Sequence, residues 1–139
     1  GYFSVQLLDE VHTKMNSLLA VAGAHVDGIY VCPHHPEAKE DKYRKKCDCR
    51  KPGTGLLEQA AFDLNLDLER SYLVGDRWSD VKCAVRAGCT PVLVMTGYGR
   101  GDHDYSGPTQ KDQPAFVADT LLDAVQWIAG KMGRSSGRH

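Results

Sequence analysis

The chain has 139 residues, of which 42% are hydrophobic and 25% charged, and its formal net charge is −1. This length predicts one domain with its own core, and the charge argues against a nucleic-acid-binding protein, which is usually basic. No apolar stretch approaches the roughly 18 residues that span a bilayer, so we expect neither a nucleic-acid nor a membrane partner. The five cysteines cannot all pair within one chain, and we predict a reduced, cytoplasmic protein.

The first predicted elements are a helix and a strand. Ser4 is a suitable N-cap, apolar residues then recur at helical spacing from Leu8 to Ala22, and Gly23 is suited to end the helix. Residues 26–32 (VDGIYVC) have the β-branched and aromatic composition of a strand. Residues 33–53 contain three prolines and many charges without a clean period, which predicts a loop.

The rest of the chain alternates helices with apolar strands. Helices are predicted over residues 54–64, 79–87 (ended by Gly88) and 121–128, strands over 71–75, 90–96 and 115–117, and a Gly- and Asp-rich loop over 97–114. We therefore expect one α/β domain over residues 1–130, with a parallel sheet covered by helices on both faces, and a mobile tail over 131–139. In such sheets ligands bind beyond the carboxyl ends of the strands.

The loop over residues 32–53 carries a set of metal ligands. Cys32-x-His34, twelve residues, and Cys47-x-Cys49 together offer three thiolates and an imidazole, which suit tetrahedral Zn²⁺. Because protein atoms fill all four positions, we predict a structural zinc that closes a loop too charged to fold on its own core. An incidental group of reduced cysteines is the alternative, while a strained Cys47–Cys49 disulfide is disfavoured; His35 is interpreted as a neighbour of the site.

Charged side chains follow the metal loop and the strand over residues 71–75. Arg50 and Lys51 come directly after the last predicted zinc ligand, where they can bind a phosphate group; a solvated basic run is the alternative. Asp76 follows the strand, where a carboxylate can bind Mg²⁺. Asp80, four residues later, is predicted either to cap the next helix or to support the site from behind.

The motifs CPHHP, CDCRKP and YLVGDRWSDV together resemble the haloacid dehalogenase superfamily of aspartyl phosphatases, and within it the heptose bisphosphate phosphatases and the related histidinol phosphatases. The resemblance implies that Lys51 binds the phosphoryl group, that Asp76 binds Mg²⁺, and that Arg50 and Arg77 contact the substrate phosphate. It also implies a Rossmann-like fold, a sugar phosphate as substrate, and a monomer when the protein is full length.

One part of the family pattern is missing from this chain. The family's nucleophile lies in a D-x-D motif that ends an N-terminal strand, and no such motif occurs here. We therefore expect that the first strand–helix–strand unit is absent and that the chain alone is inactive, while the full-length parent is a Mg²⁺-dependent phosphatase. The alternatives are a histidinol-phosphate phosphatase, a non-catalytic zinc-stabilised module that binds phosphorylated ligands or proteins, and a receiver-like domain in which Asp76 accepts a phosphoryl group.

Overall fold

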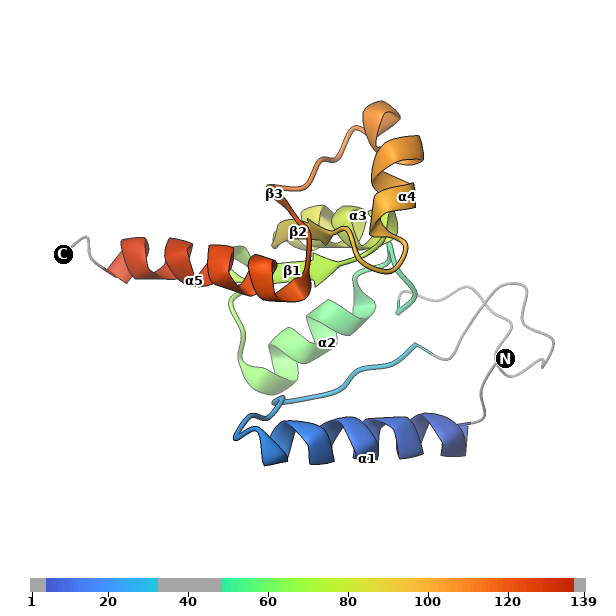
Figure 1. The fold of residues 1–139 in the computed structure, drawn as a ribbon, viewed down its shortest axis with the longest axis vertical. Helices are drawn as coiled ribbons and strands as arrows, with labels where there is room; N and C mark the ends of the chain where they lie inside the picture. Colours follow the sequence, from blue (N-terminus) through green and yellow to red (C-terminus); the bar gives the residue numbers. More distant parts are fainter. Residues whose placement is uncertain (1–4, 33–48, 137–139) are drawn as a thin grey trace.

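The structure, a computed structural model, describes residues 5–32 and 49–136 (Figure 1). Three parallel strands form one sheet in the order β1-β2-β3, with Tyr72 beside Thr90 and Val92 beside Phe116. The strands are β1 (Tyr72–Gly75), β2 (Thr90–Val94) and β3 (Phe116–Ala118), and the longer helices are α1 (Val5–Val21), α2 (Gly55–Leu64), α3 (Trp78–Ala87) and α5 (Leu121–Ser136). All three strands and all four of these helices lie where the sequence predicts them, with ends that differ by a few residues except in α5, which continues from the predicted end at residue 128 to Ser136.

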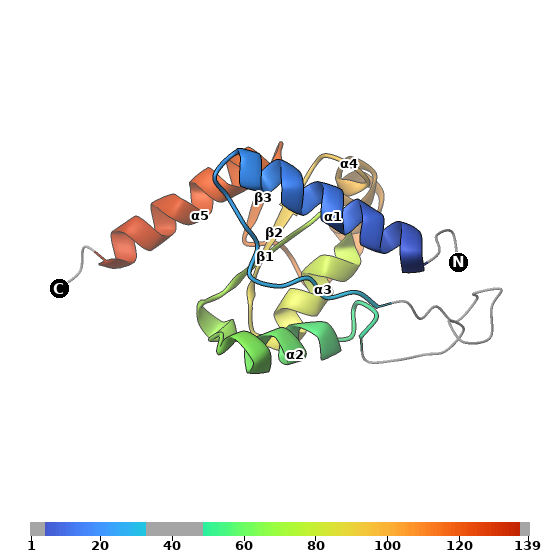
Figure 2. The ribbon, with the colours of Figure 1, turned by 90° about the horizontal axis from the view of Figure 1, so that it is seen from below.

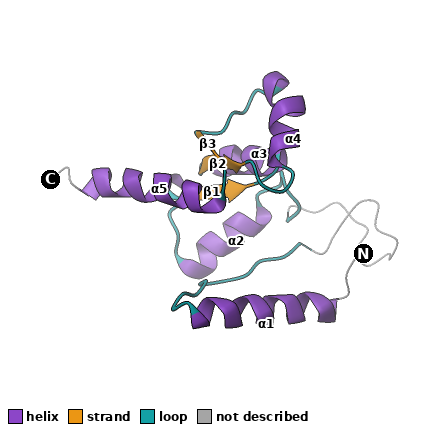
Figure 3. Ribbon diagram, in the orientation of Figure 1, coloured by secondary structure: helices purple, strands orange, loops and turns teal. Residues whose placement is uncertain are grey.

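Helices cover both faces of the sheet because successive side chains of β2 point to opposite sides. Val92 and Val94 pack with Ala118 and with Ala124 of α5 in one buried cluster. Leu93, which is 0% exposed, packs on the other face against α3. The predicted α/β architecture, a parallel sheet between helices, is therefore confirmed (Figure 3).

Aromatic side chains attach α5 to the sheet. The Trp127 ring stacks on Phe116 with 4.8 Å between ring centroids, and meets Tyr72 edge-on at 6.1 Å. Beyond this contact α5 runs past the sheet, as two views show (Figures 1 and 2). It ends at Ser136, so residues 131–136, which the sequence assigns to a mobile tail, are helical. The glycines of α5 do not prevent a helix, because each costs only about 1 kcal/mol. Lys131 also lies over the Trp127 ring.

Residues 97–114 are more ordered than the predicted loop. The segment contains three short helical turns, namely α4 (Gly99–Gly101), a π-helical turn η3 (Asp102–Ser106) and a 3₁₀ turn η4 (Gly107–Thr109). Gly97 begins the segment at φ +60, and Gly99 lies so close to the Val94 carbonyl that no Cβ would fit. The sequence does not predict these turns because the segment has no regular apolar period. Tertiary contacts stabilise short helical turns of this kind.

The strand predicted over residues 26–32 is wrong. The segment is extended but pairs with none of the three described strands, and its Ile29 and Val31 are 39% and 41% exposed. Composition favours a strand only where a neighbouring strand can complete the hydrogen bonds, and the free side of β1 is not paired within the described residues.

The first helix contributes nothing to the buried core. In α1 no residue is buried, although Gly23 ends the helix at φ +75 as expected. None of the described helices has the length and apolar character needed to cross a membrane.

Candidate active site at the carboxyl end of the strands

Asp76 lies directly after β1, at the edge of the sheet where ligands are expected. Its side chain is partly buried, and its Oδ2 accepts a hydrogen bond from the Tyr98 backbone N–H at 3.1 Å. Tyr98 belongs to the segment after β2, so the ends of two adjacent strands meet at this carboxylate. Gly97 approaches so closely that a Cβ there would overlap the Asp76 carboxylate.

Asp80 is the only buried charged residue of the described part of the chain, with 4% of its surface exposed. Its Oδ2 accepts a hydrogen bond from the Arg77 backbone N–H at 3.1 Å, which caps the N-terminus of α3. Its Oδ1 lies 2.5 Å from the Lys51 Nζ. Gly75 permits this packing because any Cβ at that position would collide with the Asp80 side chain.

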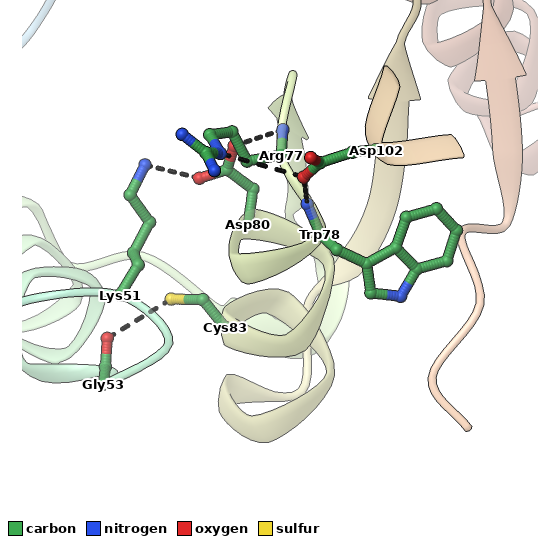
Figure 4. A network of polar contacts seen from close by, with 7 residues as sticks. All are labelled: Lys51, Gly53, Arg77, Trp78, Asp80, Cys83 and Asp102. Atoms are coloured by element: carbon green, nitrogen blue, oxygen red, sulfur yellow. Dashed lines mark hydrogen bonds and ion pairs between the residues drawn. The ribbon is translucent and has the colours of Figure 1, made fainter. Parts of the chain in front are cut away.

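Lys51 reaches the site from the chain that precedes α2 (Figure 4). Its side chain is half exposed, at 50%, so the ammonium group touches Asp80 on one side and remains accessible on the other. Behind it, the buried Cys83 thiol of α3 donates to the Gly53 carbonyl with a sulfur–oxygen distance of 3.4 Å. Burial, the largest cause, raises the pKa of the Cys83 thiol, so this group stays protonated and attaches the Lys51 segment to α3. Arg50, next to Lys51, is exposed.

Arg77 follows Asp76 in the chain, and the segment after β2 holds its side chain. Its Nε lies 3.7 Å from the Asp102 Oδ2, and its guanidinium carbon lies 4.6 Å from the centre of the Tyr98 ring. The same Asp102 oxygen accepts a 2.7 Å hydrogen bond from the Trp78 backbone N–H. The sequence shows Asp102 and Asp104 only as a poor match to the family's nucleophile motif, so their position near Arg77 could not be predicted.

Four predicted site residues thus lie along one edge: Lys51 contacts Asp80, Asp80 accepts from the backbone of Arg77, and Asp76 precedes Arg77 in the chain. This arrangement places two cationic side chains close to an acidic strand end. Such a site can bind an anion through the cations and a divalent cation through the free oxygen of a carboxylate. The roles of the individual residues remain predictions.

The predicted zinc site is only partly described. Cys32 and Cys49 lie together, with their Cα atoms 5.4 Å apart, and form a disulfide in this structure, where we expected two reduced thiolates. His34 and Cys47 lie outside the described residues. Within the described ranges no cluster of three or more His, Cys, Asp or Glu side chains could hold a metal ion.

A cavity of about 290 Å³ opens beside Lys51, between α2, β1 and the extended segment that contains Tyr30. Half of its eight lining residues are aliphatic, namely Leu56, Leu57, Ala60 and Leu73. A doubly phosphorylated sugar needs several charge partners, and Lys51 is the only charged residue among those that line this cavity. The cavity therefore gives no reason to move the predicted phosphate contacts away from Lys51 and Arg77.

Comparisons with known proteins agree with this geometry. The HAD-hydrolase-like family model matches residues 48–124. A D-glycero-beta-D-manno-heptose-1,7-bisphosphate 7-phosphatase of Haemophilus ducreyi is 48% identical over 92% of this chain and 68% of its own length. The Escherichia coli K12 protein of the same name is 42% identical over 92% of this chain and 64% of its own.

A solved structure has the same fold. It is the D,D-heptose 1,7-bisphosphate phosphatase of B. bronchiseptica complexed with magnesium and phosphate. Its sequence is 32% identical to this chain, and the TM-score is 0.77. The match covers 93% of this chain and 66% of the length of the solved chain. The chain thus spans about two thirds of the length of these relatives. With a family model over more than half of its residues and close relatives along nearly all of it, the chain belongs to the HAD-like hydrolase family.

Proposed function

We propose that this chain is part of a Mg²⁺-dependent phosphatase that removes the 7-phosphate from D-glycero-D-manno-heptose 1,7-bisphosphate. One structural observation carries the proposal: Asp80 holds the Lys51 ammonium beside the strand end that bears Asp76. A cation for the phosphoryl oxygens and a carboxylate for a divalent cation are thereby brought to one edge. The names of the relatives supply the substrate.

The residues present fit a magnesium ion. Asp76 uses its Oδ2 to accept from Tyr98, which leaves Oδ1 without a hydrogen-bond partner among the described residues. Magnesium commonly takes one or two protein carboxylates and completes its shell with water and substrate phosphate, so the remaining Asp76 oxygen could serve as its protein ligand. Asp76 would hold the ion, which when bound supplies positive charge to the phosphoryl oxygens. Asp80 is already occupied by Lys51 and the Arg77 amide.

The basic side chains would bind and orient the substrate. Lys51, held at its inner side by Asp80, would contact the phosphoryl oxygens and stabilise the charge they gain in the transition state. Arg77 and Arg50 would contact substrate phosphate from the two sides of this position. All three keep an exposed side chain, as a substrate-binding group requires.

The full-length protein would need an aspartate nucleophile, which the family pattern places in an N-terminal D-x-D motif. Its carboxylate oxygen would attack phosphorus while the bond to the sugar oxygen breaks, and the second aspartate of that motif would donate a proton to the sugar oxygen. Water would then cleave the aspartyl-phosphate to restore the carboxylate and release inorganic phosphate. We assign this role neither to Asp102, which caps α3 and pairs with Arg77, nor to Asp104, which contacts His103.

We also propose a structural zinc held by Cys32, His34, Cys47 and Cys49 when the chain is reduced. Supporting this, Cys32 and Cys49 are 17 residues apart in sequence but adjacent in space. Zinc content measured by mass spectrometry on protein purified under reducing conditions tests the proposal. We expect about one zinc per chain and its loss in Cys49→Ser; equal zinc in both would refute the assignment.

The function is tested by phosphate release from the full-length protein. We expect release from heptose 1,7-bisphosphate that requires added Mg²⁺ and exceeds release from histidinol phosphate. Faster release from histidinol phosphate would favour the other related family, and no release from either substrate would refute the phosphatase assignment.

A further inference from the structure

The segment from Gly97 to Ser106 contacts two residues of the proposed site, Asp76 and Arg77. Its first residues turn back over the strand ends, where the Tyr98 backbone N–H donates to Asp76 at 3.1 Å. Two of its side chains then reach Arg77: the Tyr98 ring lies under the guanidinium, and the Asp102 carboxylate lies beside Nε. Figure 4 shows Asp102 pointing toward Arg77 and Trp78, on the far side of Asp80 from Lys51.

We propose that Asp102 is a positioning residue, which together with the Tyr98 ring holds the Arg77 guanidinium ready to bind a substrate phosphate. This inference rests on the phosphate contact of Arg77 in the proposed function. Asp102 itself touches no reacting atom.

The geometry of Asp102 allows one carboxylate both to cap α3 and to restrict Arg77. One oxygen, Oδ2, accepts from the Trp78 N–H at 2.7 Å and also faces the Arg77 Nε at 3.7 Å. The Trp78 side chain is only 4% exposed and its indole N–H donates to the Asp112 carbonyl at 2.9 Å, so the helix end that fixes Asp102 is rigid. A carboxylate fixed in this way can in turn restrict a half-exposed arginine.

The contacts leave the phosphate-binding end of Arg77 available. Nε faces Asp102, and one face of the guanidinium lies on Tyr98. The two terminal nitrogens pair with no carboxylate among the described residues, and they are the pair of donors that binds phosphate in parallel. An arginine whose rotamers are already restricted loses less entropy when phosphate binds.

The test separates this role from the cap. Asp102→Asn keeps an oxygen that can accept from the Trp78 N–H but removes the charge that faces Arg77. In the full-length protein we expect the Kd for inorganic phosphate, measured by calorimetry with Mg²⁺, and the KM for the sugar phosphate to rise about 2- to 12-fold, the equivalent of freeing one ordered side chain. The kcat and the Tm should stay close to those of the wild type.

Controls make the outcome specific. Asp104→Asn removes a neighbouring carboxylate that contacts His103 and should leave the phosphate Kd unchanged. In an Arg77→Ala background, which should itself weaken phosphate binding, Asp102→Asn should have no further effect, because the two act as one unit.

Three results would overturn the inference: an unchanged or lower phosphate Kd in Asp102→Asn, an equal effect when Arg77 is absent, or no phosphate binding by the wild type. The failure of the proposed function would look different. In that case phosphate would bind and respond to Asp102→Asn, but heptose 1,7-bisphosphate would not be hydrolysed.

Discussion

Replacing Asp80 tests how the site is held together. The Asp80→Ala variant loses the helix cap on the Arg77 N–H, which is worth about 1 kcal/mol, and the contact with Lys51. Because the Lys51 side chain is half exposed, solvent screens this ion pair, and we assign it at most about 1 kcal/mol. The freed ammonium can turn to water, so no further penalty for an unpaired buried charge arises.

The expected loss is therefore about 2 kcal/mol in the free energy of unfolding for Asp80→Ala, and about half of that for Asp80→Asn, whose amide oxygen can still accept from the Arg77 N–H. Urea unfolding of the full-length protein, followed by circular dichroism, measures both. The catalytic rate constant should fall in both variants because Lys51 loses its support. Losses below about 0.5 kcal/mol in both variants, or an Asn variant as unstable as the Ala variant, would refute this interpretation of Asp80.

Three further predictions concern the core, the phosphate site and the buried thiols. Leu93→Ala, at a position that is 0% exposed, should lower the free energy of unfolding by about 2–5 kcal/mol, whereas Leu66→Ala, at 46% exposure, should change it by less than about 1 kcal/mol; equal losses in urea titrations would contradict the assigned core. Lys51→Ala should lower kcat about 100- to 1,000-fold, and a rise in KM alone would show that Lys51 binds the ground state only. Burial raises the pKa of the Cys83 and Cys89 thiols in the folded protein. Above about pH 8.5 these thiols therefore lose their protons more readily in the unfolded chain than in the folded one, and the free energy of unfolding should fall as the pH rises. The same decline in a Cys83→Ala, Cys89→Ala double variant would assign it to other groups.

The sequence predicts those parts of the fold whose signals are local. The apolar run of β2 and the helical period of α3 are visible without tertiary information, and Gly88 ends α3 at φ +85 as its type suggests. Residues 26–32 show the limit: they have the composition of a strand, but whether a strand forms depends on a partner that composition cannot reveal.

The residues of the candidate site also divide into those with a local sequence signal and those without one. Asp76 and Lys51 could be named as candidates from the sequence because each belongs to a recognisable motif, and Asp80 because its spacing suits a cap. Asp102 could not, since its role depends on the way in which Gly97 and Gly99 return the chain over the strand ends. The contacts of Asp102 are formed across 24 residues of sequence, and no periodicity encodes them.

The central claim is that Asp76 serves a Mg²⁺-dependent phosphatase, and one comparison tests it most directly. Inorganic phosphate released from D-glycero-D-manno-heptose 1,7-bisphosphate is measured for the full-length wild type and Asp76→Asn, each with Mg²⁺ and with a chelator. We expect release only from the wild type with Mg²⁺, because Asn removes the charged oxygen that would hold the ion. Release that persists in Asp76→Asn, or that does not depend on Mg²⁺, would contradict the claim.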